Sequence, residues 1–502
     1  MSPPPWCHHV VAIPFPFGTH ATPLLALTAR LAAASPSTRF TFLINTPHPN
    51  STTLPHNIIP HEIHVRYNGD RGGGVEGMIG VFMREAETSM GKWVNEVEQE
   101  SGVRVEGLIC DAFMWFCGRV GEELGVWWIG VWTSGVGSLC AHLETDLFRD
   151  RIIGVGGPEG KEDEQLDFIP GFSPIRARDL PDGVITGDLN SPFSQMLYNM
   201  ALALPKAAAV AINSFEDLQH DISSYIMSSK LPKLLHIGPL SLTSPHKTPQ
   251  SDDHQCILWL DQHEQNSVAY ISFGSVCTPP PSEIIALAEA LDATGVSFLW
   301  SMNDNAKAKL PQWLMEKANE KGKVVPWAPQ LPILGHRSVS VFVTHGGWNS
   351  VSEGIISGVP MICRPFFGDQ MLNRRTIESV WRIGVGVERG VFTKDSVVRA
   401  IEKVMRSDVG KTMRKNVMFL KERAKEAAKV DGSSDRNLKS LIKIIAVPDS
   451  KDEIMTRIEK DGRSSREEET SRGYKRSDSQ QSQMKTGKLA HCHEVPIVYT
   501  MP

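Results

Sequence analysis

The sequence of 502 residues predicts two doubly wound α/β domains that face each other across a cleft. Its apparent strands are continuous apolar runs, which is typical of a parallel sheet covered by helices on both faces. Helical patterns alternate with these runs, as a doubly wound fold requires. The alternation stops at residues 241–254 and then starts again, so we predict two domains of comparable size.

The predicted N-terminal domain spans residues 1–240. The apolar run from His9 to Phe15 is its first strand, and an amphipathic helix follows from Thr19 to Ala34 with Thr19 as N-cap. Further strands are predicted at 39–45, 105–110 and 126–132, and a further helix at 112–124. In this fold ligands bind beyond the carboxyl ends of the strands, so we expect the functional side chains at those ends.

Residues 241–254 are polar, contain two prolines and are predicted to be a linker. The predicted C-terminal domain covers residues 255–446, with strands at 267–273, 296–302, 339–344 and 360–364 and helices at 281–293, 348–357 and within 370–445. Residues 447–502 form a predicted disordered tail. Between Ser450 and Lys488, 18 of 39 residues are charged, and no apolar periodicity is present.

Charge and composition exclude several classes of protein. The net charge of −5 disfavours a nucleic-acid binder, which should contain a strongly basic domain. Residues 1–10 lack the basic and apolar regions of a signal peptide, and the eight cysteines are sparse, so we expect a cytoplasmic protein with reduced thiols. The uncharged run from Leu124 to Ala141 contains four glycines, so we expect a buried strand, a turn and a helix start there, and no insertion in the membrane.

The segment from Thr344 to Gly354, THGGWNSVSEG, has the chemistry of a diphosphate site. A predicted strand ends at Thr344 and a helix starts at Trp348, with Gly346 and Gly347 between them. Glycines allow close approach of a ligand to the backbone, and the N–H groups of a helix start favour an anion. On its own this pattern is a weak indication, because many turns share it.

The block from Trp327 to Gln370 resembles the sugar-nucleotide signature of plant family 1 UDP-dependent glycosyltransferases. Its 44 residues begin with WAPQ, contain HGGWNS followed by Glu353, and end with DQ, all at the spacing of that family. The resemblance extends over about residues 10–445. Several segments of the chain look most similar to those of flavonoid 3-O-glucosyltransferases. It implies the GT-B arrangement of two Rossmann-like domains. The family often has Cys where this chain has Gly346, and we expect no loss of phosphate binding from this difference.

The resemblance also implies which residues bind the donor. Trp327 should stack on uracil and the Ala328 backbone should read its edge. Gln330 and Glu353 should bind the ribose. The diphosphate is assigned to the turn at Gly347 and to Ser275, His345, Asn349 and Ser350. The sugar is assigned to Trp348, Asp369 and Gln370, and the sugar or β-phosphate to Thr133. A terminal Gln is usual for glucose donors in this family, which favours UDP-glucose.

The catalytic pair is expected in the N-terminal domain. His20 follows the first strand and Asp111 follows a later one, so both should lie on one rim of the sheet. Neutral His20 would take the proton of an acceptor hydroxyl, and Asp111 would stabilise the imidazolium that forms. Family members have His and Asp in the same motifs. The acceptor surface is expected to contain Phe15, Phe17, Phe113, His142 and Phe367.

The expected reaction is an inverting transfer of glucose from UDP-glucose to a flavonoid, at the 3-hydroxyl of a flavonol or anthocyanidin. No Asp-x-Asp motif lies in the predicted cleft, so we expect neither a metal nor another cofactor. Another UDP-sugar such as galactose or rhamnose, another phenolic or terpenoid acceptor, and a non-catalytic UDP-sugar-binding protein remain alternatives. We expect a monomer. A nicotinamide oxidoreductase is disfavoured, because no G-x-G-x-x-G follows the first strand.

Overall fold

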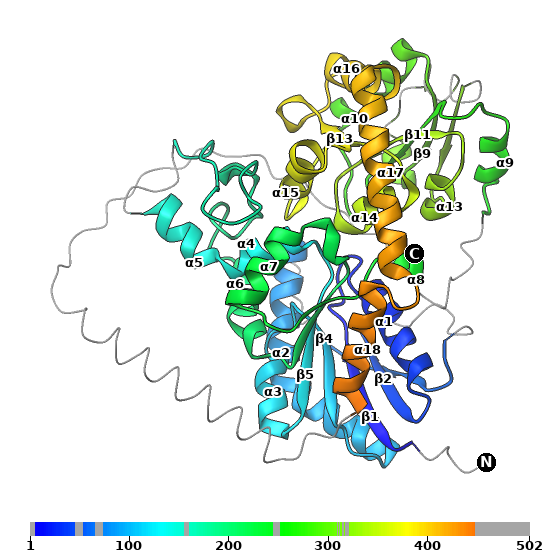
Figure 1. The fold of residues 1–502 in the computed structure, drawn as a ribbon. Helices are drawn as coiled ribbons and strands as arrows, with labels where there is room; N and C mark the ends of the chain where they lie inside the picture. Colours follow the sequence, from blue (N-terminus) through cyan, green and yellow to red (C-terminus); the bar gives the residue numbers. More distant parts are fainter. Residues whose placement is uncertain are drawn as a thin grey trace.

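The computed structural model describes residues 6–45, 54–65, 74–154, 160–243, 252–308 and 321–446, together with residues 310, 312, 313 and 316. Figure 1 shows two lobes, one built around each of two sheets. Every strand ladder in these described ranges is parallel. The prediction of two doubly wound α/β domains is therefore confirmed.

The first sheet has seven strands in the order β3-β2-β1-β4-β5-β6-β7. Strand order reverses between β1 and β4, and ligand sites of doubly wound folds lie at such a switch point. The predicted strands at 39–45, 105–110 and 126–132 are confirmed to within two residues. The strands are β1 His8–Ile13, β2 Thr38–Ile44, β3 Ile58–Glu62, β4 Gly107–Asp111, β5 Trp127–Trp132, β6 Ala209–Ile212 and β7 Leu234–His236.

Helices cover both faces of the first sheet and bury a separate apolar cluster on each face. They are α1 Ala21–Ala34, α2 Gly74–Ser101, α3 Cys117–Leu124, α4 Val136–Leu143, α5 Thr145–Phe148, α6 Pro192–Ala203, α7 His220–Ser229 and α8 Leu240–Thr243. Thr19 was predicted to cap α1, and this is wrong. His20 occupies the N-cap position, and its side chain makes no capping hydrogen bond because the ring is engaged elsewhere.

The second sheet has six strands in the order β10-β9-β8-β11-β12-β13. They are β8 Val268–Ser272, β9 Ser297–Ser301, β10 Gly322–Val325, β11 Val339–Thr344, β12 Met361–Cys363 and β13 Gly384–Gly386. The helices of this domain are α9 Cys256–Asp261, α10 Pro281–Thr294, α11 Asp304–Lys307, α13 Gln330–Leu334, α14 Trp348–Ser357, α15 Gln370–Arg375, α16 Lys394–Arg406 and α17 Asp408–Ala428.

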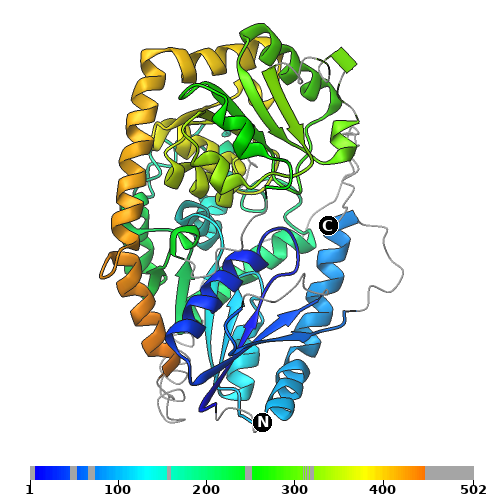
Figure 2. The same cartoon turned by 90° about the vertical axis from the view of Figure 1, so that its right-hand side faces the viewer.

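The last described helix, α18 Ser433–Ala446, returns to the first sheet. Figures 1 and 2 show α17 running down from the second lobe and α18 continuing along the first. Leu438, Leu441 and Ile445 are buried in one cluster with Val10 of β1. The predicted C-terminal domain, residues 255–446, therefore includes a helix that belongs in space to the first lobe, because the apolar face of α18 packs against the first sheet. The predicted linker lies mostly outside the described residues, and the predicted tail at 447–502 lies wholly outside them.

The uncharged run from Leu124 to Ala141 forms β5 and the start of α4, as expected. Among the described helices, none has both the length and the apolar character that a membrane crossing requires.

Candidate active site

The carboxyl ends of the two sheets meet at the boundary between the domains. Asn349, in the first turn of α14, donates from Nδ2 to Thr19 Oγ1 at 3.1 Å. Ser134, just after β5, donates from its hydroxyl to the carboxylate of Asp369. Loops that follow strands of both sheets are thus hydrogen-bonded to each other, which is where the sequence placed the candidate residues.

His20 and Asp111 are brought together as predicted. The His20 Nδ1 lies 2.8 Å from Asp111 Oδ2, and the Asp111 side chain is 1% exposed whereas that of His20 is 22% exposed. The backbone N–H of Phe113 donates to Asp111 Oδ1 at 3.0 Å, which fixes the carboxylate. Thr133 Oγ1 lies 3.1 Å from the same His20 nitrogen.

This geometry selects one form of the His20 ring. With a carboxylate at Nδ1, the proton of a neutral imidazole is best placed on that nitrogen. The lone pair is then on Nε2, where it can accept a proton from a hydroxyl group. A carboxylate behind the ring also stabilises the imidazolium that follows. The pair therefore has the arrangement of a general base with an orienting acid.

Aromatic side chains surround the base. The Phe113 ring centroid lies 4.6 Å from that of His20, and the Phe15 centroid lies 5.2 Å from it in an edge-on arrangement. Phe15 is buried and Phe113 is half-buried. Phe17 is half-buried and packs against Phe15 with centroids 5.1 Å apart. Phe15 is therefore mainly a core residue, and Phe17 and Phe113 supply the more accessible apolar surface.

The other two predicted acceptor residues have different environments. His142 on α4 is buried, packs edge-on against Trp132, and desolvation lowers its pKa to about 4, so the ring is neutral. Phe367 lies in the loop after β12 and is 45% exposed. His142 thus belongs to the wall behind the site, whereas Phe367 presents a free aromatic face.

The predicted uridine residues form a polar network beside an exposed ring. Trp327 is 46% exposed, unusual for a tryptophan, whereas Ala328 next to it is buried. Gln330 donates from Nε2 to Ser350 Oγ at 3.1 Å and to Glu353 Oε2 at 2.7 Å. Burial raises the pKa of the Glu353 carboxyl, and the bond from Gln330 opposes this shift. An exposed ring face and an oriented carboxylate suit a base and a ribose.

The predicted diphosphate site has a buried polar atom without a partner. His345 Nδ1 is buried and has no hydrogen-bond partner among the described residues, and desolvation lowers the His345 pKa to about 4. The ring lies close to Gly274 and Gly347, where an added Cβ would approach ring atoms to 3.0 Å and 2.3 Å. Gly346 has a φ of +82°, which favours glycine there. Ser275 follows Gly274 in the loop after β8, and it is exposed.

Asp369 has the environment of a ligand-binding carboxylate. It accepts from Ser134, and from Asn373 Nδ2 at 3.0 Å. Burial raises the pKa of its carboxyl, and the nearby His20 is among the groups that oppose this shift. The predicted base therefore lies close enough to the Asp369 carboxyl, across the domain boundary, to affect the pKa of that carboxyl. Gln370 is buried, and its Oε1 accepts from the backbone N–H of Phe366 at 2.8 Å.

Trp348, predicted to contact the sugar, makes a contact between the domains. Its side chain is 5% exposed, and its indole N–H donates to the backbone oxygen of Asn213 in the N-terminal domain at 2.8 Å. Gly135 lies so close to the ring that an added Cβ would approach it to 2.6 Å. The indole donor is therefore satisfied by the interdomain contact, and the predicted sugar contact stays a prediction.

Sequence reasoning missed three residues of this network. Ser134 holds Asp369, Thr19 accepts from Asn349, and Asn373 links Asp369 to the backbone oxygen of Gly346 at 3.0 Å. A helical spacing of four residues between Asp369 and Asn373 was the one signal available, because such residues share a face. The contacts of Ser134 and Thr19 depend on how the domains meet, which no local pattern encodes.

Known proteins resemble the chain over most of its length. Residues 80–429 match the family described as UDP-glucoronosyl and UDP-glucosyl transferase. A flavonol 3-O-glucosyltransferase of Actinidia chinensis var. chinensis is 45% identical over 446 residues, 87% of this chain and 96% of the relative. An anthocyanidin 3-O-galactosyltransferase of the same plant is 44% identical over 447 residues, 87% of this chain and 97% of the relative.

A solved structure shows the same fold. The crystal structure of a UDP-glucose:anthocyanidin 3-O-glucosyltransferase in complex with UDP superimposes with a TM-score of 0.80 at 34% identity, and covers 88% of this chain and 99% of its own. Its two domains correspond to the two domains described above. The chain therefore belongs to the UDP-glucoronosyl and UDP-glucosyl transferase family and is a UDP-dependent glycosyltransferase with the GT-B fold.

Proposed function

We propose that this enzyme transfers glucose from UDP-glucose to the 3-hydroxyl of a flavonol or anthocyanidin and gives a β-O-glucoside. The observation that carries the proposal is the His20–Asp111 pair, 2.8 Å apart and placed at the boundary where Asp369 and Asn349 of the C-terminal domain arrive. The acceptor class is supported by the two relatives described above, which are named as flavonol and anthocyanidin enzymes.

The proposed step is a single displacement. His20 Nε2 takes the proton of the acceptor hydroxyl while its oxygen forms a bond to the anomeric carbon. The bond from that carbon to the β-phosphate oxygen breaks, and UDP departs with the electron pair. Attack from the face opposite UDP converts the α-linked donor into a β-glycoside. Asp111, held by the Phe113 amide, stabilises the imidazolium until its proton is lost.

The negative charge on the departing UDP needs stabilisation, and chain groups can supply it. The first turn of α14 presents backbone N–H groups, and Asn349 and Ser350 carry polar side chains there. The unpartnered Nδ1 of neutral His345 is a further polar group beside this turn. We therefore propose that transfer proceeds without a metal, and that an excess of EDTA leaves the rate unchanged.

The proposed acceptor is a planar polyphenol, which suits an aromatic surface with few polar groups. Phe17 and Phe113 lie on the base side, and Phe367 lies on the donor side with 45% of its surface exposed. An acceptor between them would contact both domains. The 3-hydroxyl is the proposed nucleophile because both relatives described above are named as 3-O-glycosyltransferases.

The donor sugar has a second candidate. The galactosyltransferase relative is 44% identical and the glucosyltransferase relative 45% identical, so overall similarity does not separate the two sugars. Gln370 favours glucose by resemblance, yet its Oε1 is engaged by the Phe366 amide and only part of the side chain remains for a ligand. Galactose is therefore the alternative donor that the test must include.

Product analysis tests the proposed function. The purified protein is incubated with a flavonol or an anthocyanidin and either UDP-glucose or UDP-galactose, and the products are separated and weighed by mass spectrometry. We expect a mono-hexoside that co-elutes with the 3-O-β-glucoside standard and is absent with His20→Ala. Tight UDP binding without product from any phenol would overturn the acceptor class and leave the family unchanged.

The proposed enzyme acts as a monomer in the cytoplasm. The six buried cysteines within the described residues are free thiols, which suits a reducing compartment. A single species of about 55.5 kDa in analytical ultracentrifugation would support the monomer.

A further inference from the structure

The short helix α15 is held by the N-terminal domain at its start. Asp369, its N-cap residue, accepts from Ser134 of the loop after β5. The backbone N–H of Gly368 donates to Asp182 Oδ2 at 2.8 Å. Two side chains of the N-terminal domain therefore hold the loop that presents Asp369 and Gln370, the residues proposed to bind the sugar.

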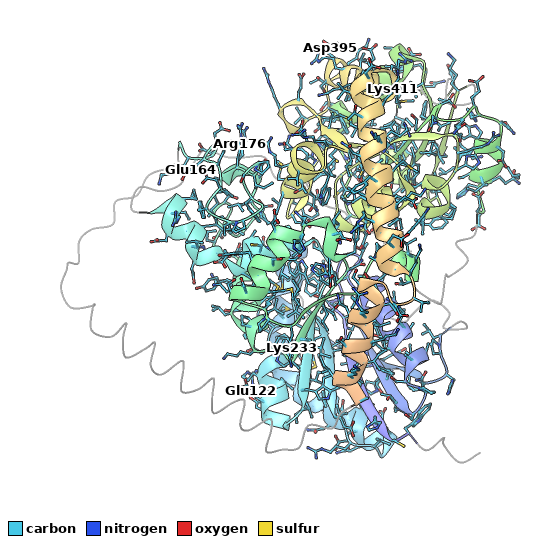
Figure 3. The ribbon with its side chains drawn as sticks, in the orientation of Figure 1. Glu122, Glu164, Arg176, Lys233, Asp395 and Lys411 are labelled. Carbon is cyan, nitrogen blue, oxygen red and sulfur yellow. The ribbon has the colours of Figure 1, made fainter. Side chains whose placement is uncertain are left out.

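The end of α15 is held by a buried carboxylate. Arg375 Nε donates to Asp179 Oδ2 at 2.7 Å, and Arg374 Nη2 lies 3.6 Å from Asp179 Oδ1. Asp179 is 1% exposed and ends a short 3₁₀ helix, Ala177–Asp179, of the N-terminal domain. Figure 3 labels Arg176, whose backbone N–H also donates to Asp179 Oδ2, in the part of that domain that reaches toward α15.

These contacts differ from an ordinary surface ion pair. The Arg375 and Arg374 side chains are 14% and 16% exposed, so little solvent screens their charges from Asp179. Both arginines lie in the last turn of α15, whose first residue is Gln370 and whose N-cap is Asp369. The contacts of Asp179 therefore hold the same six-residue helix that begins with the residues proposed to bind the sugar.

We infer that Asp179, Asp182 and Arg375 are positioning residues, which fix α15 and the loop before it so that Asp369 and Gln370 present the sugar to the His20 side of the boundary. This inference rests on the proposed function, because it assigns the sugar to the start of α15. It predicts a defined kinetic effect. The uridine network of Trp327, Gln330 and Glu353 lies on other elements, so loss of the ion pair should affect the chemical step and leave UDP affinity intact.

The test compares Asp179→Asn with a matched variant. Asparagine retains an oxygen for the Arg176 amide and loses the charge that Arg375 meets. The control is Asp217→Asn, which breaks another interdomain pair, Asp217 Oδ2 to Arg423 Nη2 at 2.6 Å, whose side chains are 41% and 45% exposed and which contains no residue of α15. We expect kcat of Asp179→Asn to fall about 10–100-fold, as misplaced reacting groups require, and kcat of Asp217→Asn to be unchanged. The Kd of UDP, measured by calorimetry, should be unchanged in both.

A double-mutant cycle tests the pair itself. The double variant Asp179→Asn with Arg375→Gln should be no slower than the slower of the two single variants. The variant Arg375→Lys, which keeps the positive charge, should have a higher kcat than Arg375→Gln. Additive losses, a kcat of Asp179→Asn equal to wild type, or a parallel loss of UDP affinity would each overturn the inference. An equal loss in Asp217→Asn would overturn it too, because any interdomain contact would then suffice.

A second variant covers the case in which Asp179→Asn does not fold. Asp182 is exposed, so Asp182→Ala should fold and should lose only its bond to the Gly368 amide. We expect a loss of about fivefold in kcat, in keeping with one hydrogen bond, and wild-type kcat would overturn the inference. Wild-type protein is assayed first with UDP-glucose and a flavonol. No product there would overturn the proposed function, whereas active wild type with unaffected variants overturns the positioning role alone.

Discussion

Asn349 and Thr19 are hydrogen-bonded across the domain boundary, with 3.1 Å between Nδ2 and Oγ1. Thr19 directly precedes His20, and Asn349 lies in the first turn of the helix proposed to hold the diphosphate. One hydrogen bond therefore links the loop of the proposed base to the loop of the proposed leaving group. Interdomain contacts of this kind set the distance between acceptor oxygen and anomeric carbon, on which the rate depends steeply.

Removal of the proposed base should abolish most of the transfer. His20→Ala should lower kcat by about 10²–10⁴-fold, the usual contribution of a positioned base. Asp111→Asn should have a smaller effect, because Asn can still accept from the Phe113 amide but cannot stabilise an imidazolium. Steady-state rates and UDP affinity are measured for both variants. A kcat of His20→Ala close to wild type would contradict the assignment.

Trp327 should contribute to donor binding without contributing to the core. Its side chain is 46% exposed, so Trp327→Ala should change Tm little and should raise the KM for UDP-glucose. Loss of aromatic stacking costs about 1–3 kcal/mol per base, or roughly 5–150-fold in KM. Trp327→Phe should retain part of the affinity. Leu258→Ala, which removes a 60% exposed side chain on α9, is the control and should leave KM unchanged.

Trp348→Phe should weaken the contact between the domains. Phenylalanine keeps most of the apolar area but loses the indole N–H that donates to the Asn213 oxygen at 2.8 Å, which would leave a buried acceptor unpaired. The expected loss is about 1–3 kcal/mol, seen as a lower Tm in calorimetry. A variant with wild-type Tm and a raised KM for UDP-glucose would instead support the sugar contact that the sequence suggested.

His236 should make stability depend on pH. It is 1% exposed on β7, neither ring nitrogen has a hydrogen-bond partner in the described part of the chain, and desolvation lowers its pKa from 6.5 to about 4. The unfolded chain therefore binds the proton more readily between those values, so stability is complete above pH 6.5 and falls as the pH drops toward 4. His236→Leu removes this loss.

The comparison of Tm at two pH values measures that effect. At pH 7 the Tm of His236→Leu should be close to wild type or above it. The variant should have a higher free energy of unfolding than wild type at pH 5, and this difference should be about 2 kcal/mol larger at pH 5 than at pH 7. Each pKa unit corresponds to about 1.36 kcal/mol. His61→Leu is the control, because that ring is partnered by Glu100 near the surface. A constant difference between wild type and His236→Leu at both pH values would contradict the prediction.

Most interior strands could be predicted from sequence, whereas the four-residue β6 and the edge strands β3 and β10 were not predicted. The runs that became β1, β8 and β11 are buried along nearly their whole length, and apart from the two histidines that open β1 and Tyr270 in β8 their residues are apolar or small. The edge strand β3, IIPHE, has only its first residue buried and contains Pro60, and β10, GKVV, has only two apolar residues. Such strands are defined by their neighbours more than by their own composition.

The candidate site shows the same division. His20 and Asp111 could be paired from sequence because the ends of parallel strands share one rim of a sheet. The interdomain contact of the Trp348 side chain could not, because Gly135 and Asn213 belong to the other domain. Asp179 had no distinguishing pattern around it, since its partners lie 195 and 196 positions away in the chain, at Arg374 and Arg375.

The return of α18 to the first sheet matters for anyone who recombines this enzyme with its relatives. A chimera with one junction near the linker would take α18 from the second parent and insert foreign residues at Leu438, Leu441 and Ile445 into the first parent's core. Two junctions, one in the linker and one between α17 and α18, would keep the cluster that contains Leu438, Leu441 and Ile445 of single ancestry. The exchangeable module is thus discontinuous in the gene and continuous only in the folded protein.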